Sequence, residues 1–354
     1  MAASKKFAVG LVGVSGYTGM ELARLLSVHP ALRLVRATSR KEERRKLGRL
    51  HPFLRGFACG ELVISSPDPE DLASACDLVF LAVPHGTAMT IGAELLHRGC
   101  RVVDLSADFR LREASVYEAW YGIEHKAPAL LAEAVYGLPE LYGPRIAAAR
   151  LTANPGCYPT VSILGLYPAL QHKLVEEHGL IIDAKSGVSG AGRELRPGSL
   201  FCEVSDGFKA YSPVVHRHTP EIEQELSAIA AEDLAVTFTP HLLPVNRGIL
   251  ATIYATLKDK SLTLEQALEV YAGTYAKHPF VRVLPAGDLP ELRNVRGTMF
   301  CDIGVVVDQR AGRLLLVACI DNLCRGASGQ AVANANLMLG LDLRTGLLTP
   351  ALTP

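Results

Sequence analysis

One cysteine of this sequence, Cys157, has a setting that suits a nucleophile. It follows the turn-forming residues Asn-Pro-Gly at 154–156, and residues 157–170 then carry apolar side chains at helical spacing, with Pro159 in the expected first turn. A thiol at a helix N-terminus lies at the positive end of the helix dipole, which favours the reactive thiolate. Backbone N–H groups there can also stabilise an oxyanion on an attacked carbonyl. A cysteine at a helix start can equally be structural, so other residues must decide between the two interpretations.

A nucleophilic thiol needs a partner that handles its proton. The densest group of candidates is the segment 214–226, which contains His216, His218 and Glu221. A His-x-His pair on a strand can also bind a metal, but no third ligand with metal-type spacing follows, and we therefore predict no metal site. Pro220 indicates a helix start, which would put Glu221 in a first turn where it can also simply interact with the helix dipole.

An arginine downstream suits the binding of an anionic substrate. We expect the segment 241–250 to form a loop between two strands, and this loop carries His241 and Arg247. A guanidinium in such a loop can hold a carboxylate or phosphate through paired hydrogen bonds. The other seven cysteines and the isolated histidines have no comparable neighbours, and we expect them to be ordinary core or surface residues.

A glycine pattern near the start of the chain suits phosphate binding. The apolar run 7–14 leads into G-x-x-G-x-x-G, after which apolar residues recur at helical spacing. Glycines permit a tight turn, and the following helix N-terminus presents N–H groups to a phosphate. The spacing differs from the commoner G-x-G-x-x-G, so a plain strand-to-helix turn is the alternative. In the dinucleotide interpretation the contacting residues are Gly13, Ser15, Gly16, Tyr17, Thr18 and Gly19.

The end of the second expected strand indicates which dinucleotide would bind. An NAD site favours Asp or Glu there, to hold the ribose hydroxyls. This chain instead has Ser39, Arg40 and Lys41, which suit a 2′-phosphate, and we therefore favour NADP. Because charged residues continue to Lys46, a solvated basic turn is the alternative.

The arrangement of these segments predicts an α/β protein with two domains. Strands are expected at 7–14, 32–39, 61–65, 77–84 and 101–106, with helical patterns after the glycine loop and at 86–98. Strands that alternate with helices predict parallel βαβ units in a doubly wound sheet. This first domain would span 1–151.

Beyond residue 150 the pattern changes to long strands with fewer helices. Strands are expected within 179–193, 234–257, 298–308 and 312–323, with one amphipathic helix at 263–278. This pattern predicts an α+β domain, at 152–325, with a largely antiparallel sheet. A last helical segment, 326–341, is rich in small residues, and we expect 326–354 to return to the first domain.

Composition excludes several classes of protein. Lys plus Arg and Asp plus Glu are 36 each, so no net charge points to nucleic acid. No apolar run has the roughly 18 residues needed to span a bilayer, and we expect no membrane association. The strand-like run starts almost at once, so we expect no signal peptide. The eight cysteines include no C-x-x-C pair, which favours free thiols and a cytoplasmic enzyme.

Nine motifs, in order along nearly the whole chain, resemble the N-acetyl-γ-glutamyl-phosphate reductases of arginine biosynthesis. They are GVSGYTG (13–19), VFLAVPHG (79–86), DLSADFR (104–110), YGLPEL (136–141), NPGCYPT (154–160), SGVSGAGR (186–193), HRHTPEIEQEL (216–226), PHLLPVNRGI (240–249) and DNLCRGASGQA (321–331). The cysteine and His-x-His motifs are quite specific, whereas the glycine loop alone is not. The family often has lysine where this chain has Arg325, and both side chains are cations.

The resemblance implies a Rossmann-type domain followed by a catalytic and dimerisation domain like that of aspartate-semialdehyde dehydrogenases. It implies NADPH-dependent reduction of N-acetyl-L-glutamyl 5-phosphate, a small-molecule acyl phosphate, to N-acetyl-L-glutamate 5-semialdehyde through a thioester on Cys157. His218, or His216 in its place, would be the acid/base, and Glu221 would orient that imidazole. A homodimer or homotetramer is expected.

The resemblance also implies further binding residues. Contacts to the substrate carboxylate or phosphate would come from Arg110, Ser186, Arg193 and Arg247. Cofactor contacts beyond the glycine loop, Ser39 and Arg40 would come from Pro84, Asn322 and Gly326.

Three other functions fit parts of the same pattern. A sibling reductase of lysine biosynthesis acts on a carrier-bound aminoadipyl phosphate, but the mixed charge of 201–215 fits an acidic carrier poorly. An aspartate-semialdehyde dehydrogenase would differ around the cysteine and the histidines. A non-catalytic NADP-binding protein would have no chemical need for Cys157, His216 and His218.

Overall fold

The computed structural model describes residues 6–353, and the chain divides into two compact units that we describe separately. The first unit comprises the described chain up to Pro155 together with Ala327–Leu348. The second comprises Gly156–Gly326 and the chain from Thr349 onward. The returning segment, predicted as 326–354, is therefore shorter in the structure and ends at Leu348.

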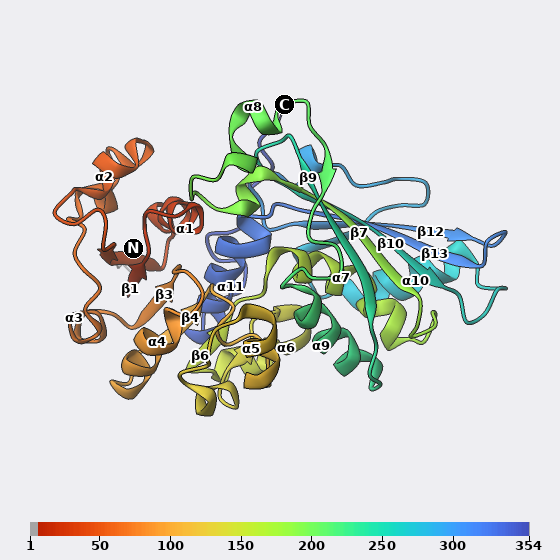
Figure 1. Ribbon diagram of the computed structural model, residues 1–354, viewed down its shortest axis with the longest axis horizontal. Helices are drawn as coiled ribbons and strands as arrows, with labels where there is room; N and C mark the ends of the chain where they lie inside the picture. Colours follow the sequence, from red (N-terminus) through yellow and green to blue (C-terminus); the bar gives the residue numbers. More distant parts are fainter. Residues whose placement is uncertain (1–5, 354) are drawn as a thin grey trace, which may run out of the picture. The chain divides into compact units, whose positions relative to one another are not determined.

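The first unit is built on a six-stranded parallel sheet in the order β2-β1-β3-β4-β6-β5 (Figure 1). All four residues of β3 are buried, as expected for a strand covered on both faces. The predicted doubly wound parallel sheet is confirmed. The strands are β1 (Phe7–Val12), β2 (Leu32–Thr38), β3 (Leu78–Leu81), β4 (Arg101–Asp104), β5 (Val135–Tyr136) and β6 (Leu151–Ala153).

One predicted strand of this unit, 61–65, is wrong. Only single bridges form there, between Val63 and Lys46 and between Ser65 and Thr38. The segment starts inside a 3-10 turn, η2 (Ala58–Glu61), and Pro67, which has no backbone N–H, follows it closely. The segment therefore contributes isolated bridges and no ladder.

Helices connect the parallel strands, and one of them comes from the far end of the sequence. Helix α11 (Gly329–Met338) packs against α1 and α6, and small residues such as Ala331 and Ala335 are fully buried. The other helices are α1 (Tyr17–Ser27), α2 (Leu47–Leu50), α3 (Pro69–Ala75), α4 (Ala88–His97), α5 (Ala114–Tyr121), α6 (Pro139–Ala148), η1 (Pro52–Leu54) and η3 (Pro128–Leu131).

The second unit is built on a seven-stranded mixed sheet in the order β11-β12-β13-β10-β7-β9-β8. Its pairs are antiparallel except for β7 with β9 and β11 with β12, so the predicted largely antiparallel sheet is confirmed. The strands are β7 (Leu180–Gly187), β8 (Lys209–Ala210), β9 (Val236–Leu243), β10 (Ile249–Thr256), β11 (Val281–Val283), β12 (Cys301–Asp308) and β13 (Arg313–Ile320).

The loop predicted at 241–250 is shorter than expected. Strand β9 pairs with β7 as far as Leu243, so His241 lies within a strand and not in a loop. Arg247 does lie in the connection, between β9 and β10. The structure thus separates the two residues that the sequence pattern had grouped.

Three helices cover one face of this sheet: α7 (Cys157–Gln171), α9 (Thr219–Ala230) and α10 (Leu264–Tyr275) (Figure 1). Helix α7 is buried nearly all round, since it packs on β10 and β13 and against the other two helices. Shorter segments are α8 (Phe201–Val204), η4 (Val188–Ala191), η5 (Pro197–Ser199), η6 (Leu292–Asn294) and a π-helical turn, η7 (Cys324–Ser328). Within residues 6–353 there is no helix with both the length and the apolar character needed to cross a membrane.

Candidate active site

The glycine loop of the first unit has a geometry that only glycine permits at two positions. Gly13 has φ +95°, and a Cβ there would lie 2.1 Å from the carbonyl oxygen of Ala82. A Cβ on Gly19 would lie 2.2 Å from the carbonyl oxygen of Gly13. The strand, turn and helix therefore pack backbone against backbone.

The start of helix α1 is suited to an anion. Gly16 is its N-cap residue, and no side chain caps the helix or places a negative charge in its first turn. A Cβ on Gly16 would meet nothing closer than 3.9 Å, so the backbone is open on that side. The N–H groups of the first turn, at Tyr17 and Thr18, can accordingly bind a phosphate.

The basic turn after β2 adjoins the glycine loop. The backbone N–H groups of Gly13 and Val14 both donate to the carbonyl of Thr38, at 3.0 and 3.2 Å. Ser39 is buried, and its hydroxyl accepts from the N–H of Lys41 at 3.3 Å and lies 3.4 Å from the Ser15 hydroxyl. Arg40 is exposed. A cation thus follows directly on the residues that hold the turn against the glycine loop.

The loop that contains Pro84 is held by a buried carboxylate. Asp108 accepts from the N–H of Gly86 at 2.7 Å, from the N–H of Ala88 at 3.0 Å and from the Tyr117 hydroxyl at 2.8 Å. These bonds fix the loop at the end of β3 and the start of helix α4. Sequence reasoning missed Asp108, although it lies inside the motif at 104–110.

Arg110, a predicted substrate contact, is 7 % exposed and holds backbone in the first unit. Its Nε donates to the carbonyl of Asn154 at 2.8 Å, and its Nη2 donates to the carbonyl of Leu105 at 3.0 Å. These two bonds tie the segment after β4 to the residue that precedes the Pro-Gly turn.

In the second unit, helix α7 begins at Cys157, with Gly156 as the N-cap residue, so the predicted helix start is confirmed. Cys157 is half-buried. Burial raises the pKa of other thiols, for example to about 12 for Cys76 and to about 11 for Cys100, so those groups stay protonated at neutral pH. Cys157 thus combines partial exposure with the positive end of a helix dipole.

Glu221 lies beside this helix start. It is 1 % exposed, and its Oε1 accepts from the N–H of Gly156 at 2.8 Å. Glu221 is in the first turn of α9, as predicted, but its carboxylate also serves the N-terminus of α7. Glu221 therefore joins the start of α7, at Cys157, to the start of α9, where His218 is the N-cap residue.

The two histidines of the His-x-His motif lie with their ring centroids 4.9 Å apart. His218 is the N-cap residue of α9, and its backbone N–H donates to Nδ1 of His216 at 3.1 Å. Burial, with a smaller contribution from the Arg217 charge, lowers the pKa of His216 to about 4. His216 is therefore a neutral imidazole at neutral pH, with Nδ1 as an acceptor.

Two tyrosines that sequence reasoning missed lie beside the histidines. The hydroxyls of Tyr158 and Tyr211 are 2.9 Å apart, and both rings contact the His216 ring edge-on, with centroids 5.5 and 5.6 Å away. Burial raises the pKa of Tyr211 to about 12, and a negative charge at Cys157 contributes to the rise. The paired hydroxyls are therefore neutral, and one of them donates to the other. Tyr158 follows the cysteine directly, but nothing in the sequence indicates its pairing with Tyr211.

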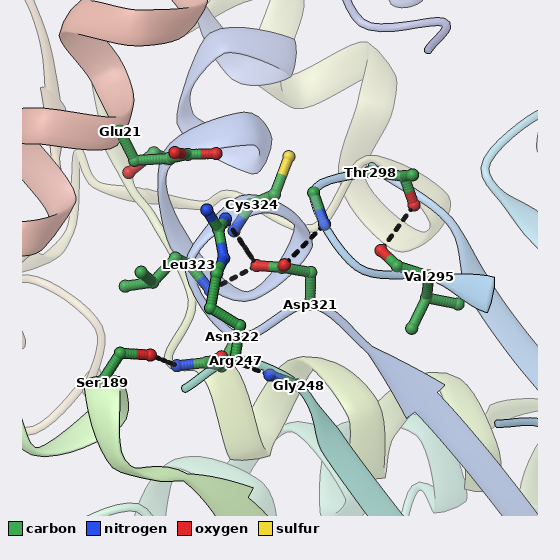
Figure 2. A network of polar contacts seen from close by, with 12 residues as sticks. Glu21, Ser189, Arg247, Gly248, Val295, Thr298, Asp321, Asn322, Leu323 and Cys324 are labelled. Atoms are coloured by element: carbon green, nitrogen blue, oxygen red, sulfur yellow. Dashed lines mark hydrogen bonds and ion pairs between the residues drawn. The ribbon is translucent and has the colours of Figure 1, made fainter. Parts of the chain in front are cut away.

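The predicted anion contacts of this unit occupy different settings. Ser186, near the end of β7, is buried, and its hydroxyl donates to the carbonyl of Gly187 at 3.1 Å. Arg193 lies in an exposed segment after η4. Arg247 forms an ion pair with Asp321, with Nη2 and Oδ1 2.9 Å apart (Figure 2).

Two residues predicted to contact the cofactor have protein partners in this unit. The amide of Asn322 lies between Ser189, whose hydroxyl accepts at 3.0 Å, and Gly248, whose N–H donates at 2.7 Å (Figure 2). Gly326 lies against the cysteine, since a Cβ on Gly326 would be 2.6 Å from that of Cys157.

Each unit thus holds one half of the predicted machinery. The glycine loop, Ser39, Arg40 and Pro84 belong to the first, whereas Cys157, Glu221 and the two histidines belong to the second. Within the described chain, no group of three or more His, Cys, Asp or Glu side chains could hold a metal ion.

Comparison with known proteins decides the family. The model of the semialdehyde dehydrogenase NAD binding domain matches residues 8–149, and that of the semialdehyde dehydrogenase dimerisation domain matches 157–322. The chain is 52 % identical over 346 residues to an N-acetyl-gamma-glutamyl-phosphate reductase of Pelotomaculum thermopropionicum, covering 98 % of this chain and 99 % of the relative. The chain belongs to the N-acetyl-gamma-glutamyl-phosphate reductases. The reductase of Geobacter sulfurreducens is also 52 % identical, over 347 residues and with the same coverage.

Solved structures of aspartate semialdehyde dehydrogenases share the fold of this reductase family member. The Vibrio cholerae enzyme II has a TM-score of 0.73 at 16 % identity, covering 95 % of this chain and 99 % of its own. The Candida albicans enzyme, solved with NADP, has a TM-score of 0.70 at 16 % identity and the same coverage. At that identity the similarity concerns the fold alone.

Proposed function

We propose that the chain catalyses the NADPH-dependent reductive dephosphorylation of N-acetyl-L-glutamyl 5-phosphate to N-acetyl-L-glutamate 5-semialdehyde in arginine biosynthesis. The observation that carries the proposal is the half-buried Cys157 at the first position of α7. Glu221 accepts from the preceding N–H, and the two histidines contact the ring of the next residue, Tyr158. The sequence identity to reductases of that name supplies the substrate.

In the first step, the Cys157 thiolate attacks the carbonyl carbon of the acyl phosphate. A C–S bond forms, the C–O bond to phosphate breaks, and inorganic phosphate leaves with the electron pair. The N–H groups of the first turn of α7 favour both the thiolate and the oxyanion of the tetrahedral intermediate. The hydroxyls of Tyr158 and Tyr211 use one proton in the hydrogen bond between them, so the pair can offer one further donor at this site.

The second step reduces the thioester to the aldehyde. When bound, NADPH supplies a hydride to the thioester carbon. The oxygen that becomes negative takes a proton from the acid/base to form the thiohemiacetal. The thiohemiacetal then returns this proton to the same group as the C–S bond breaks, which releases the semialdehyde and regenerates the thiolate. We assign this proton handling to His218, because His216 has its pKa lowered to about 4 and Nδ1 engaged by a backbone N–H.

The first unit fits the phosphates of NADP. The N–H groups at the start of α1, at Tyr17 and Thr18, would hold the pyrophosphate, and Arg40 with Ser39 would hold the 2′-phosphate. Pro84 would border the ligand in a loop that Asp108 fixes. For the substrate anion we propose Arg247 together with Ser186 and Arg193.

We also propose that the protein is a homodimer formed through the open face of the second sheet. Four apolar residues on that face are neighbours across four strands, because Tyr254 lies opposite Ile181 and Leu315, and Leu315 lies opposite Val306. All four are at least partly exposed in the single chain. Leu315→Arg should give monomers by analytical ultracentrifugation, whereas a wild-type protein that is already monomeric would refute the proposal.

The eight free thiols of this chain fit a reducing cytoplasm, where we place the reaction. The reverse reaction tests the proposed function directly. N-acetylglutamate semialdehyde, inorganic phosphate and NADP⁺ should yield NADPH absorbance, and aspartate semialdehyde and carrier-linked aminoadipate semialdehyde should yield much less. No NADPH from the acetylated substrate would refute the proposal, and a preference for the carrier-linked one would assign the chain to lysine biosynthesis.

A further inference from the structure

The connection before β10 and the turn after β13 meet at one buried carboxylate, that of Asp321. We propose that Asp321 is a positioning residue, which fixes Arg247 for the substrate anion and fixes the turn that lies behind Cys157. The inference rests on the proposed function, since that function makes Arg247 an anion contact and Cys157 the nucleophile.

Four donors converge on this carboxylate (Figure 2). Oδ1 accepts from Arg247 Nη2 at 2.9 Å, from the N–H of Leu323 at 2.9 Å and from the N–H of Cys324 at 2.7 Å. Oδ2 accepts from the N–H of Gly297 at 2.7 Å. The Asp321 side chain is fully buried, so its negative charge depends on these donors.

The register of the sheet explains why the two charges meet. Ile249, the first residue of β10, lies opposite Ile320, the last residue of β13. Arg247 precedes Ile249 by two positions, and Asp321 follows Ile320 directly. Antiparallel pairing therefore delivers both side chains to the same end of the sheet.

The ion pair limits how Arg247 can point. Its side chain is 21 % exposed, so solvent and small solutes can still reach it. Asn322 holds the neighbouring residue, because its Oδ1 accepts from the N–H of Gly248 at 2.7 Å. Because Asp321 holds Nη2 of the planar guanidinium, the orientation of the whole group toward an anion is restricted before binding.

The same carboxylate shapes the turn η7. The N–H groups of Leu323 and Cys324 donate to the Asp321 side chain, and the N–H of Gly326 donates to the Asp321 carbonyl at 2.9 Å. Gly326 in turn leaves no room for a side chain, since its Cβ would lie 2.6 Å from Cys157 Cβ and 3.0 Å from Cys157 Cα. A displacement of this turn would therefore move Gly326, which packs against Cys157.

If the role of Asp321 were purely structural, its substitution should have the same effects as substitution of another buried, ion-paired aspartate of the sheet. Asp302, on β12, provides the matched control, since it is 3 % exposed and binds Arg282 at 2.6 and 2.8 Å. Asp302→Asn should lower stability to urea and leave substrate binding and Cys157 reactivity unchanged. Asp321→Asn should change all three.

The kinetic arm uses the reverse reaction with N-acetylglutamate semialdehyde. Asp321→Asn should raise the KM for this substrate by about 10- to 100-fold, the size expected for losing one hydrogen bond to a charged group. Arg247→Lys should raise the KM comparably. The KM of the double variant should lie within about twofold of the higher of the two single-variant KM values, because both changes remove the same interaction. Fully additive effects, or a wild-type KM in Asp321→Asn, would overturn the proposal.

The thiol arm does not depend on the substrate. Iodoacetamide alkylation of Cys157, followed by peptide mass spectrometry across pH, should differ from wild type in Asp321→Asn and match it in Asp302→Asn. If Asp321→Asn does not fold, Gly326→Ala replaces it, and a wild-type alkylation profile in that variant would contradict the link from turn to cysteine. If the wild-type enzyme lacks activity with the acetylated substrate, the proposed function fails, and the alkylation profiles still decide the role of Asp321.

Discussion

The carboxylate of Glu221 accepts a hydrogen bond from the N–H of Gly156 at 2.8 Å, although 65 positions separate the two residues. Gly156 is the N-cap residue of α7, so the bond lies directly before Cys157. Because Glu221 also follows His218 closely at the start of α9, one side chain links the beginnings of both helices. The backbone positions of Cys157 and His218 are thereby fixed relative to each other.

This bond predicts different effects for two substitutions of Glu221. Glu221→Gln keeps an oxygen for the Gly156 N–H, whereas Glu221→Ala leaves that buried donor without its acceptor. The alanine variant should be less stable than the glutamine variant by about 1–3 kcal/mol, the cost of an unsatisfied buried group. Urea unfolding measures the difference, and equal stabilities would show that the bond contributes nothing.

The two histidines should differ in their effect on turnover. His218→Asn should lower kcat by at least about 100-fold, as expected when a general acid/base is lost. His216→Asn should cost less, because His216 is neutral at neutral pH and accepts a backbone N–H. Steady-state rates of the reverse reaction compare them, and a larger loss in His216→Asn would exchange the two roles.

The buried His216 should also shape acid stability. Its pKa is lowered from 6.5 to about 4 in the folded protein, so the unfolded chain binds more protons between these values. Its contribution to stability is therefore full above pH 6.5 and falls as the pH drops toward 4. In urea unfolding across this window, wild type should lose more stability than His216→Asn, and parallel curves would contradict the assigned burial.

Arg40 should control the choice of cofactor. Its exposed guanidinium follows the turn that adjoins the glycine loop, so Arg40→Ala should weaken NADPH binding by about 10-fold or more and leave NADH binding nearly unchanged. Arg33→Ala, exposed near the other end of β2, is the matched control. Fluorescence titration measures both cofactors, and equal losses for them would remove Arg40 from the 2′-phosphate site.

Local sequence patterns predicted much of the fold. The helix start at Cys157 was visible because Pro and Gly break a chain and apolar spacing then resumes. The parallel strands β1 to β4 showed as short apolar runs, whereas the very short β5 and β6 were not predicted. Segment 61–65 looked like such a run, but it forms only isolated bridges, next to a 3-10 turn and a proline. The pattern of apolar residues indicates the secondary structure that a segment prefers. It does not indicate whether a partner strand lies beside that segment.

The contacts that build the site were much less predictable. Tyr158 and Tyr211 are 53 positions apart, and Arg247 and Asp321 are 74 apart, so their pairing depends on strand register and helix packing. Register is a property of the whole sheet, since each strand position depends on its neighbours. The family motifs marked these segments as important without indicating which side chains meet.

The central claim is that Cys157 is acylated by the substrate, and trapping the thioester tests it most directly. The enzyme is mixed with N-acetylglutamyl phosphate in the absence of NADPH, quenched in acid and digested for mass spectrometry. We predict an N-acetylglutamyl adduct on the peptide that contains Cys157, lost on addition of NADPH and absent from Cys157→Ala, which should still bind NADPH. An adduct on another residue, or turnover by Cys157→Ala at an appreciable rate, would contradict the account.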